Sequence, residues 1–323
     1  MVLKHRSSII AILCIMVLIL TACSSGGSQS LTSDGKESQQ SQVSENNKSE
    51  SASKEESSVS QNDKSGDTSD LISGSDNTEK ENGTEGDDKA VAPDITGELV
   101  IKAEESDAVS EEGNKYVFSK GGEYHIKGTC GNRMIYIDAK DQDLDIHLEG
   151  VTMTSEIGAL IFVENAEEVT ISATEGTNNE LSDNRPARTN KKEDAEFGNA
   201  AIYSKDDLKF KGRGRLTVNG SYNNGIGCKN DIKIKNLTLT VNAQNNGIKG
   251  NDSVTIESGN ITVTAVNGTG IKTENTHISN KGNQKGYITI TGGKVDITSA
   301  DDPIDAAFDF ILDSQNAVVT TNK

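Results

Sequence analysis

The chain has no tryptophan, and aromatic residues make up only 4% of its 323 residues. An aromatic platform for a ligand ring therefore has to be sought among its six tyrosines. Positive charge is also scarce, since 32 Lys and Arg face 50 Asp and Glu and leave a formal net charge of -18. An acidic chain does not attract nucleic acid phosphates, which excludes nucleic acid as a partner.

Cysteine is too sparse for a disulfide framework. Of the four cysteines, Cys14 lies within the N-terminal apolar segment and Cys23 at its end, which leaves Cys130 and Cys228. Cys228 follows the inward-facing Ile226 by two residues on the same side of a strand, so we expect a small thiol buried in the core.

Residues 1–23 have the pattern of a secretory signal, in which a short basic region precedes an apolar run too short to span a membrane. The junction L-T-A-C ending at Cys23 resembles a bacterial lipobox, which implies that Cys23 carries lipid; a plain signal peptide with a chance cysteine is the alternative. Residues 24–93 have almost no large apolar side chains and predict a disordered tether. The expected location is the extracellular face of the cell membrane, with the folded domain at 94–323.

A strand-turn-strand unit recurs through the C-terminal half of the chain. Each unit contains two short runs of alternating apolar residues, separated by the Gly, Asn, Asp and Ser of tight turns. The isoleucines that open the units are spaced by 24, 22, 23 and 33 residues: Ile202, Ile226, Ile248, Ile271 and Ile304. Strand-only repeats of about 20 to 25 residues are typical of a parallel β-helix, whereas a propeller blade needs about 40. The sequence therefore predicts an all-β fold, a single-stranded parallel β-helix.

The strand pattern starts before these units. From about Asp94 to Ser182 the runs have looser spacing, which is typical of the opening coils and cap of the same solenoid. The polar stretch from Asp183 to Gly198 interrupts the pattern and predicts a loop that projects from one coil.

Stacking the coils places equivalent residues about 4.7 to 4.9 Å apart, so acids and amides at fixed positions form columns. One interpretation is an Asx ladder, in which stacked side chains hydrogen-bond to one another and to the turn backbone. The other is calcium, because aspartates on neighbouring coils can share an ion that relieves their repulsion. The candidate ligands come from the column four residues after each isoleucine and from an acidic group near the C-terminus: Asp206, Asp207, Asn230, Asp231, Asp252, Asp301, Asp302 and Asp305.

Two groups of residues are candidate carbohydrate contacts. Tyr222 lies in a turn directly before Asn223 and Asn224, where its ring can stack on a sugar. Arg213 and Arg215 occupy a K-G-R-G-R turn, where guanidinium groups can pair with uronate carboxylates. Solvated turns are the alternative for both groups, and Tyr203 and Tyr287 are expected to be packing residues.

The repeats carry a resemblance to a known family. The segments NAAIYSKDDLKFKGRGRLTVNG, YNNGIGCKNDIKI and QNNGIKGNDSVTIESGNITVTA resemble bacterial cell-surface carbohydrate-binding proteins that fold as right-handed parallel β-helices, similar in architecture to pectate lyases. The resemblance covers most of residues 94–323 and implies non-catalytic binding of cellulose or acidic plant polysaccharide, with calcium as cofactor. It departs where the family usually has Asp-Asp-Gly-Ile, since the units here read Asn223-Asn224-Gly225-Ile226 and Asn245-Asn246-Gly247-Ile248.

These features favour a lipid-anchored surface protein whose partners are a polysaccharide and, through the anchor, the membrane. No catalytic residue is assigned, because His125, His147 and His277 lie near no serine or cysteine in a nucleophile arrangement. A calcium-dependent polysaccharide lyase is the enzyme alternative, with Arg213 or Lys229 as its base, although analogy of fold alone supports it. A structural or adhesive surface protein is the third possibility.

Overall fold

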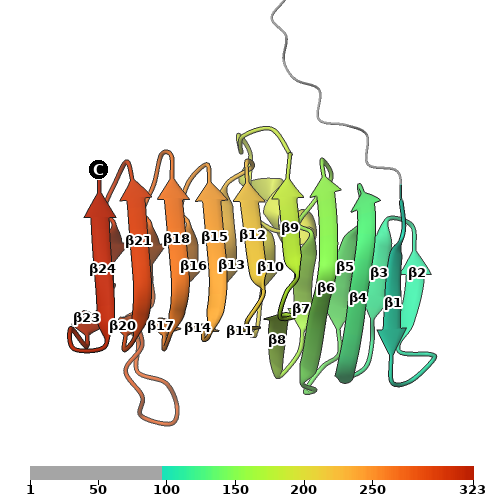
Figure 1. Cartoon of the computed structure of the whole chain (residues 1–323), viewed down its shortest axis with the longest axis horizontal. Helices are drawn as coiled ribbons and strands as arrows, with labels where there is room; N and C mark the ends of the chain where they lie inside the picture. The colour runs from blue at the N-terminus through green and yellow to red at the C-terminus, as the bar shows by residue number, and fades with distance from the viewer. Residues whose placement is uncertain (1–96) are drawn as a thin grey trace, which may run out of the picture. The chain divides into compact units, whose positions relative to one another are not determined.

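The computed structural model describes residues 97–323, which wind into stacked coils of parallel strands (Figure 1). The strands form a 15-stranded sheet and a nine-stranded sheet. In the larger sheet, β6 (Leu144–Ser155) pairs with β8 through its first half and with β9 through its second half. The solenoid therefore has three sides, which we call faces A, B and C.

Face A consists of the first halves of β4 (Gly122–Gly131) and β6, followed by β8 (Glu168–Ala173), β11 (Asp207–Gly212), β14 (Asp231–Ile234), β17 (Ser253–Ile256), β20 (Tyr287–Ile290) and β23 (Asp309–Leu312). Face B consists of their second halves, followed by β9 (Asn178–Asp183), β12 (Arg215–Gly220), β15 (Leu237–Ala243), β18 (Gly259–Ala265), β21 (Gly293–Ser299) and β24 (Ala317–Asn322).

Face C is the nine-stranded sheet of β2 (Val109–Glu112), β3 (Lys115–Phe118), β5 (Met134–Asp138), β7 (Ile161–Asn165), β10 (Ala200–Ser204), β13 (Asn224–Cys228), β16 (Ile248–Gly250), β19 (Ile271–Lys272) and β22 (Ile304–Asp305). At the N-terminal end, β1 (Leu99–Ala103) pairs antiparallel with β4, and β2 pairs antiparallel with β3. The opening strands thus depart from the parallel pattern, as the sequence predicted for a cap.

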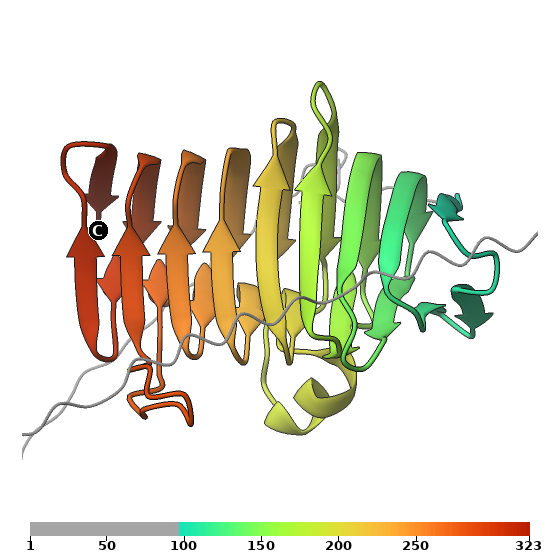
Figure 2. The ribbon, with the colours of Figure 1, turned by 90° about the horizontal axis from the view of Figure 1, so that it is seen from below.

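The register of face C confirms the repeat that the isoleucines predict. Ile202 pairs with Ile226, Ile226 with Ile248, Ile248 with Ile271, and Ile271 with Ile304. The wide spacing before Ile304 comes from a loop between β19 and β20, within which Ile278 and Gln284 form a short antiparallel bridge. The inserted residues leave the coil and return to it, so the coil's register is kept (Figure 2).

Inward side chains of all three faces form one continuous core. Leu208, Ile232, Val254 and Ile288 are register partners along face A, and each is at most 1% exposed. Cys228 and Cys130 are both buried free thiols, which confirms the expected core position of Cys228. Burial raises the pKa of the Cys228 thiol to about 12, so this group is not a nucleophile at neutral pH.

The loop predicted from Asp183 to Gly198 projects from the coil, but it begins one residue later because Asp183 ends β9. The segment 184–198 contains the short helices η1 (Lys191–Glu193) and α1 (Asp194–Phe197). Within residues 97–323, none of the helices has the length and hydropathy needed to cross a membrane. The predicted signal segment 1–23, the lipid site Cys23 and the tether 24–93 lie outside the described residues.

Candidate functional site

An open groove of about 840 Å³ lies against the outer surface of face A. Its floor is formed by outward side chains of β14, β17 and β20, and its wall by the loop between β19 and β20. Strand alternation explains the polar floor, because Val254 and Ile256 point into the core while Ser253 and Thr255 point out. In the next coil, Tyr287 pairs with Ser253, which places its ring in the groove.

Asp252 holds the wall of the groove in place. Its Oδ1 accepts a hydrogen bond of 2.7 Å from Asn275 Nδ2, and its carboxylate forms an ion pair with Lys285. Its backbone oxygen accepts a further bond of 2.6 Å from the amide of Gly286. Asp252 is only 6% exposed and thereby fixes both ends of the loop. Asp252, one of the predicted calcium ligands, therefore joins the loop to the coil through Asn275, Lys285 and Gly286.

Asp207 and Asp231 form a carboxylate pair at the start of β11 and β14, on the floor of the groove. Asp207 Oδ1 accepts a bond of 3.2 Å from the Asp231 amide, and Asp231 Oδ1 accepts one of 2.7 Å from Ser253 Oγ. Burial raises the pKa of Asp207, and the neighbouring charge of Asp231 raises it further. Lys209, on the same strand as Asp207, pairs with Glu168 instead. Two predicted ligands, with Asn230 beside them, therefore face the groove without a cationic partner in the described residues.

The other predicted calcium ligands do not line the groove. Asp206 Oδ2 accepts a bond of 3.0 Å from the amide of Ala166. On the C-terminal coil, Asp302 pairs with Lys323 at 3.1 Å, Asp305 pairs with Lys272, and Asp301 is exposed in a turn. The structure thus places the predicted calcium ligands in three separate regions: the groove, the contact of Asp206 with Ala166, and the C-terminal coil.

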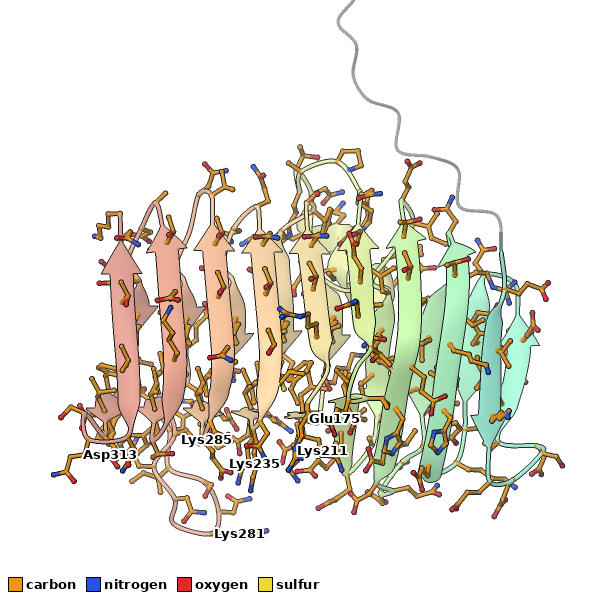
Figure 3. All side chains as sticks on the ribbon, in the orientation of Figure 1. Glu175, Lys211, Lys235, Lys281, Lys285 and Asp313 are labelled. Carbon is orange, nitrogen blue, oxygen red and sulfur yellow. The ribbon has the colours of Figure 1, made fainter. Side chains whose placement is uncertain are left out.

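A basic cleft of about 520 Å³ adjoins the groove on face A, and it contains the predicted contact Arg213. Lys209, Lys211, Lys233 and Lys235 line the same cleft, and Lys211 and Lys235 appear along the lower edge of the sheet in Figure 3. Lys233 is the register partner of Thr255, so the cleft continues the floor of the groove. A hydrogen bond from Lys233 lowers the pKa of Glu257, the one acid in the lining. Arg215 is exposed at the start of β12.

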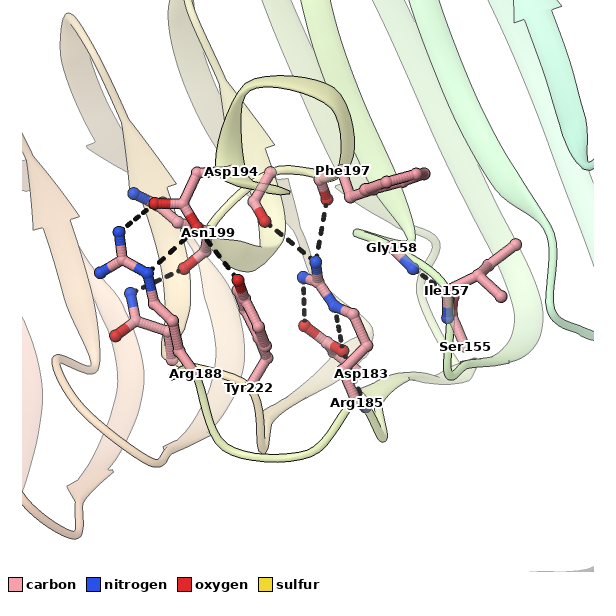
Figure 4. A network of polar contacts seen from close by, with 12 residues as sticks. Ser155, Ile157, Gly158, Asp183, Arg185, Arg188, Asp194, Phe197, Asn199 and Tyr222 are labelled. Carbon is pink, nitrogen blue, oxygen red and sulfur yellow. Dashed lines mark hydrogen bonds and ion pairs between the residues drawn. The ribbon is translucent and has the colours of Figure 1, made fainter. Parts of the chain in front are cut away.

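Tyr222 is covered, so it offers no free ring to a sugar. Its side chain is 4% exposed, and its hydroxyl forms hydrogen bonds of 3.2 Å to Asn190 O and 3.1 Å to Asp194 Oδ1 (Figure 4). The guanidinium of Arg185 stacks on the ring with its carbon 3.9 Å from the centroid. The projecting segment 184–198 supplies all three partners. Tyr222 therefore packs against this segment and does not have the sugar-stacking role that the sequence predicts.

Asn223 and Asn224 belong to an Asx ladder. Asn245 Nδ2 donates to Asn223 Oδ1 at 3.2 Å, and Asn246 Nδ2 donates to Asn224 Oδ1 at 2.9 Å. Both Asn223 and Asn224 are buried, so these amides bind the neighbouring coil. At this corner the ladder accounts for the side-chain contacts.

Residues 112–323 match the family described as carbohydrate-binding domain-containing proteins. The chain belongs to this family. A carbohydrate-binding domain-containing protein of Acetivibrio thermocellus is 39% identical over 146 residues, which are 44% of this chain and 50% of that relative. The chain therefore spans about half the length of the curated relative it matches.

Among solved structures, a gadolinium derivative of a polysaccharide lyase-like protein from C. thermocellum is 37% identical, with a TM-score of 0.58. The match covers 68% of this chain and 90% of that one. These comparisons confirm the carbohydrate-binding family that the repeat segments resemble. The solved structure that shares this fold is described as polysaccharide lyase-like.

The groove contains residues that the sequence analysis did not assign to a site. Tyr287 was expected only to pack; it does contact Phe308, at 5.1 Å between ring centroids, but it also lines the groove. Lys285 and the polar residues around it were assigned no role. The available signal was the spacing of 33 residues between Ile271 and Ile304, which marks the loop that forms the wall.

Proposed function

We propose that the chain binds polysaccharide without cleaving it, in the groove on face A. The observation that carries the proposal is an open polar groove with a tyrosine on its floor, in a member of a carbohydrate-binding family. An aromatic ring supplies an apolar surface to a sugar, and surrounding hydroxyl, amide and carboxylate groups supply hydrogen bonds. Tyr287, Thr255, Thr289 and Asn283 provide such groups in the groove.

Calcium is part of this proposal, with Asp207, Asp231 and Asn230 as its protein ligands. Calcium takes six to eight oxygen ligands, and two carboxylates without a cationic partner are suitable donors. In the described residues, no three acidic, imidazole or thiol groups form a ready metal site, so amides, water or glycan hydroxyls have to complete the shell. When bound, the ion supplies positive charge at a place where the chain itself repels acidic glycans.

The basic cleft favours a glycan with carboxylates over a purely neutral one. Arg213 and four lysines lie where a chain bound in the groove continues along face A. Each lysine also pairs with an acid of the chain, so a glycan carboxylate has to compete with that acid or share the lysine with it. Guanidinium and ammonium groups pair with carboxylates, which suits a pectin-like polymer. A cellulose-like polymer uses the groove and gains little from the cleft.

The test is equilibrium binding of the intact protein to polygalacturonate and to insoluble cellulose, each in millimolar calcium and in EDTA. Tyr287→Ala should weaken binding by about fivefold or more, since stacking is worth on the order of 1 kcal/mol per ring. Tyr136→Ala is the matched control, because Tyr136 is also half-buried and stacks on an outer sheet surface, against Phe162 on face C. Equal losses in both variants, or none, would remove the groove as the site.

A calcium-dependent lyase is the second candidate, favoured by the description of the structural neighbour as lyase-like. Of the two bases considered, Arg213 lies in the basic cleft and Lys229 lines a different hollow with Cys228 and Glu274. Neither lines the groove next to Asp207 and Asp231. Incubation with polygalacturonate and calcium should therefore give no rise in the absorbance of unsaturated product; a sustained rise would replace binding by catalysis.

We extend the proposal to the winding and the location of the protein. Connections between parallel strands are right-handed in about 98% of cases, which supports the right-handed coil that the family resemblance implies. The L-T-A-C junction at Cys23 supports a lipid anchor, so the groove would be presented at the outer face of the membrane. A surface protein of purely structural or adhesive function would show no glycan binding in the experiment above.

A further inference from the structure

A second polar cluster lies on the outer surface of face A, at its N-terminal end. In the register of β4 and β6, Glu123 pairs with Asp145 and His125 pairs with His147. Residues two apart on a strand point to the same side, so these four side chains share one patch of surface. Strand β8 separates this cluster from β11, whose first residue, Asp207, lines the groove.

The donor atoms of the cluster lie within ion-pair distance of one another. Glu123 Oε1 is 3.2 Å from His125 Nε2 and 2.9 Å from His147 Nε2, and Asp145 Oδ1 is 3.4 Å from His147 Nε2. A tetrahedral zinc ion with bonds of about 2.0 to 2.1 Å separates its ligand atoms by roughly 3.3 Å. The imidazole rings are stacked, with centroids 4.8 Å apart and planes at 14°.

The second nitrogen of His125 is held by a carboxylate. Glu149 Oε1 lies 2.6 Å from His125 Nδ1, which favours a proton on Nδ1. An ion bound at Nε2 displaces the proton that this nitrogen can share with Glu123. Metal-binding histidines commonly have such a carboxylate on the opposite nitrogen. In the described part of the chain, His147 Nε2 is buried and makes no hydrogen bond of good geometry. It is therefore a buried nitrogen without a hydrogen-bond partner, 2.9 Å from Glu123 Oε1.

Asp145 is held in place from the other side. Its Oδ2 accepts a bond of 2.6 Å from Lys211 Nζ, and its Oδ1 accepts one of 3.1 Å from Ser172 Oγ. Side chains of Glu123 and His125 are 45% and 41% exposed, so an ion can reach them from solvent. As the side chains stand, hydrogen bonds connect them and no three acidic or imidazole groups yet surround a common point. Ligation requires rotation of the exposed Glu123 carboxylate and a small tilt of the two rings.

We propose that His125, His147, Glu123 and Asp145 bind a divalent ion of the zinc class, with Glu149 orienting His125. Imidazole nitrogen suits zinc, whereas calcium takes oxygen ligands, so the site differs chemically from the carboxylate pair Asp207 and Asp231. The ion links neighbouring coils, because its ligands come from adjacent strands of face A. The proposal does not depend on glycan binding.

The experiment titrates the intact protein, prepared without a histidine tag, with zinc chloride by calorimetry, and with cobalt chloride by visible absorption. We expect one equivalent of zinc and a cobalt spectrum of tetrahedral intensity. His125→Asn and His147→Asn should each weaken zinc binding by about 100-fold or more, and Glu149→Gln by about 10- to 100-fold. Millimolar calcium should not displace the zinc.

His277→Asn is the matched control for metal binding, because His277 is an exposed histidine outside the cluster. Its zinc affinity should equal that of the unmodified chain. Zinc should also raise the unfolding temperature of the unmodified chain and of His277→Asn, but not of His125→Asn or His147→Asn. The proposal is overturned if the chain binds no zinc, if His277→Asn loses as much affinity as His125→Asn, or if His125→Asn and Glu149→Gln both bind normally.

Discussion

At the scale of single residues, the core column of face C decides stability. Ile248 is fully buried between its register partners Ile226 and Ile271. Ile248→Ala removes contacts with both neighbouring coils and leaves a cavity, so it should cost about 2 to 5 kcal/mol in the free energy of unfolding. Denaturant unfolding followed by circular dichroism measures this loss.

The control for Ile248→Ala needs an exposed position in a neighbouring coil. Lys249, the next residue along the strand, is unsuitable because its side chain is 24% exposed and paired with Glu274 at 2.8 Å. Lys229 is exposed, and Lys229→Ala should cost under about 0.5 kcal/mol. Similar losses at positions 248 and 229 would show that the inward and outward sides of the strands are misassigned.

Asp207 illustrates a residue whose charge opposes folding. Its raised pKa means that the folded chain holds the proton more tightly than the unfolded chain does. The stability present below its ordinary pKa is therefore lost as the pH rises through the raised value. Asp207→Asn keeps an acceptor for the Asp231 amide and cannot ionise. In EDTA near pH 7 the variant should unfold at a higher temperature than the unmodified chain, because its free energy of unfolding is larger by under about 1 kcal/mol. The difference should vanish near pH 3.

The same unfolding measurement, made in calcium, tests whether Asp207 is a calcium ligand. If Asp207 is a calcium ligand, millimolar calcium should raise the unfolding temperature of the unmodified chain more than that of Asp207→Asn. Equal responses to calcium in the two proteins would mean that this carboxylate is not a ligand, whatever its effect in EDTA.

At the scale of elements, the segment 184–198 is fastened to its coil by one buried ion pair. Arg185 donates to both oxygens of Asp183, at 2.9 and 2.7 Å, and to the carbonyl of Gly198 at 3.0 Å. Arg185→Leu leaves the fully buried Asp183 without its partner and should cost about 3 to 5 kcal/mol. Thermal and denaturant unfolding provide the measurement.

The double variant Asp183→Asn/Arg185→Leu separates the charge from the packing. Asparagine carries no charge, so the double variant should be more stable than Arg185→Leu alone. A double variant as unstable as the single one would indicate that Arg185 acts by stacking on Tyr222 and by its bonds to the loop carbonyls.

The strands and their register could be predicted from sequence because both depend on local pattern. Alternating apolar residues set the inward side, and the repeat spacing aligns Ile202 with Ile226 and Ile248. The same periodicity identified Asp207 and Asp231 as neighbours, since equivalent positions of adjacent coils must stack. Such contacts are non-local along the chain but follow from the repeat.

The site could be predicted only in part, because insertions decide which outward residues remain free. Tyr222 and Tyr287 both lie at outward positions of regular coils. The segment 184–198 folds over Tyr222, whereas the loop between β19 and β20 stands beside Tyr287 and leaves it in a groove. Neither insertion has a repeat partner, so no periodicity indicates where it folds. The contacts of the Asp252 carboxylate likewise depend on that loop, because Asn275 and Lys285 belong to it.

At the scale of the whole molecule, the sequence predicts an anchored binding domain. The anchor prediction is tested by Cys23→Ala in cells, because lipid attachment requires the thiol of that residue. We expect the variant to be released into the medium or to remain unprocessed, as judged by membrane fractionation and by its size. Full processing with unchanged membrane association would contradict a lipid at Cys23.

The folded domain should be independent of the predicted tether. Core residues identified in the described part of the chain begin at Leu99, and residues 24–93 contain no periodic apolar pattern that could add to that core. From this pattern we expect residues 24–93 to bury no apolar surface against the solenoid, so their removal should preserve its stability. A chain that begins near Asp94 should unfold within about two degrees of a chain that begins after Cys23, at equal calcium concentration. Its affinity for polysaccharide in solution should also be the same, since Asp207, Asp231 and Tyr287 all lie within the domain. A fall of more than several degrees would place part of the fold before Asp94, whereas a loss of affinity at unchanged unfolding temperature would assign a glycan contact to residues 24–93.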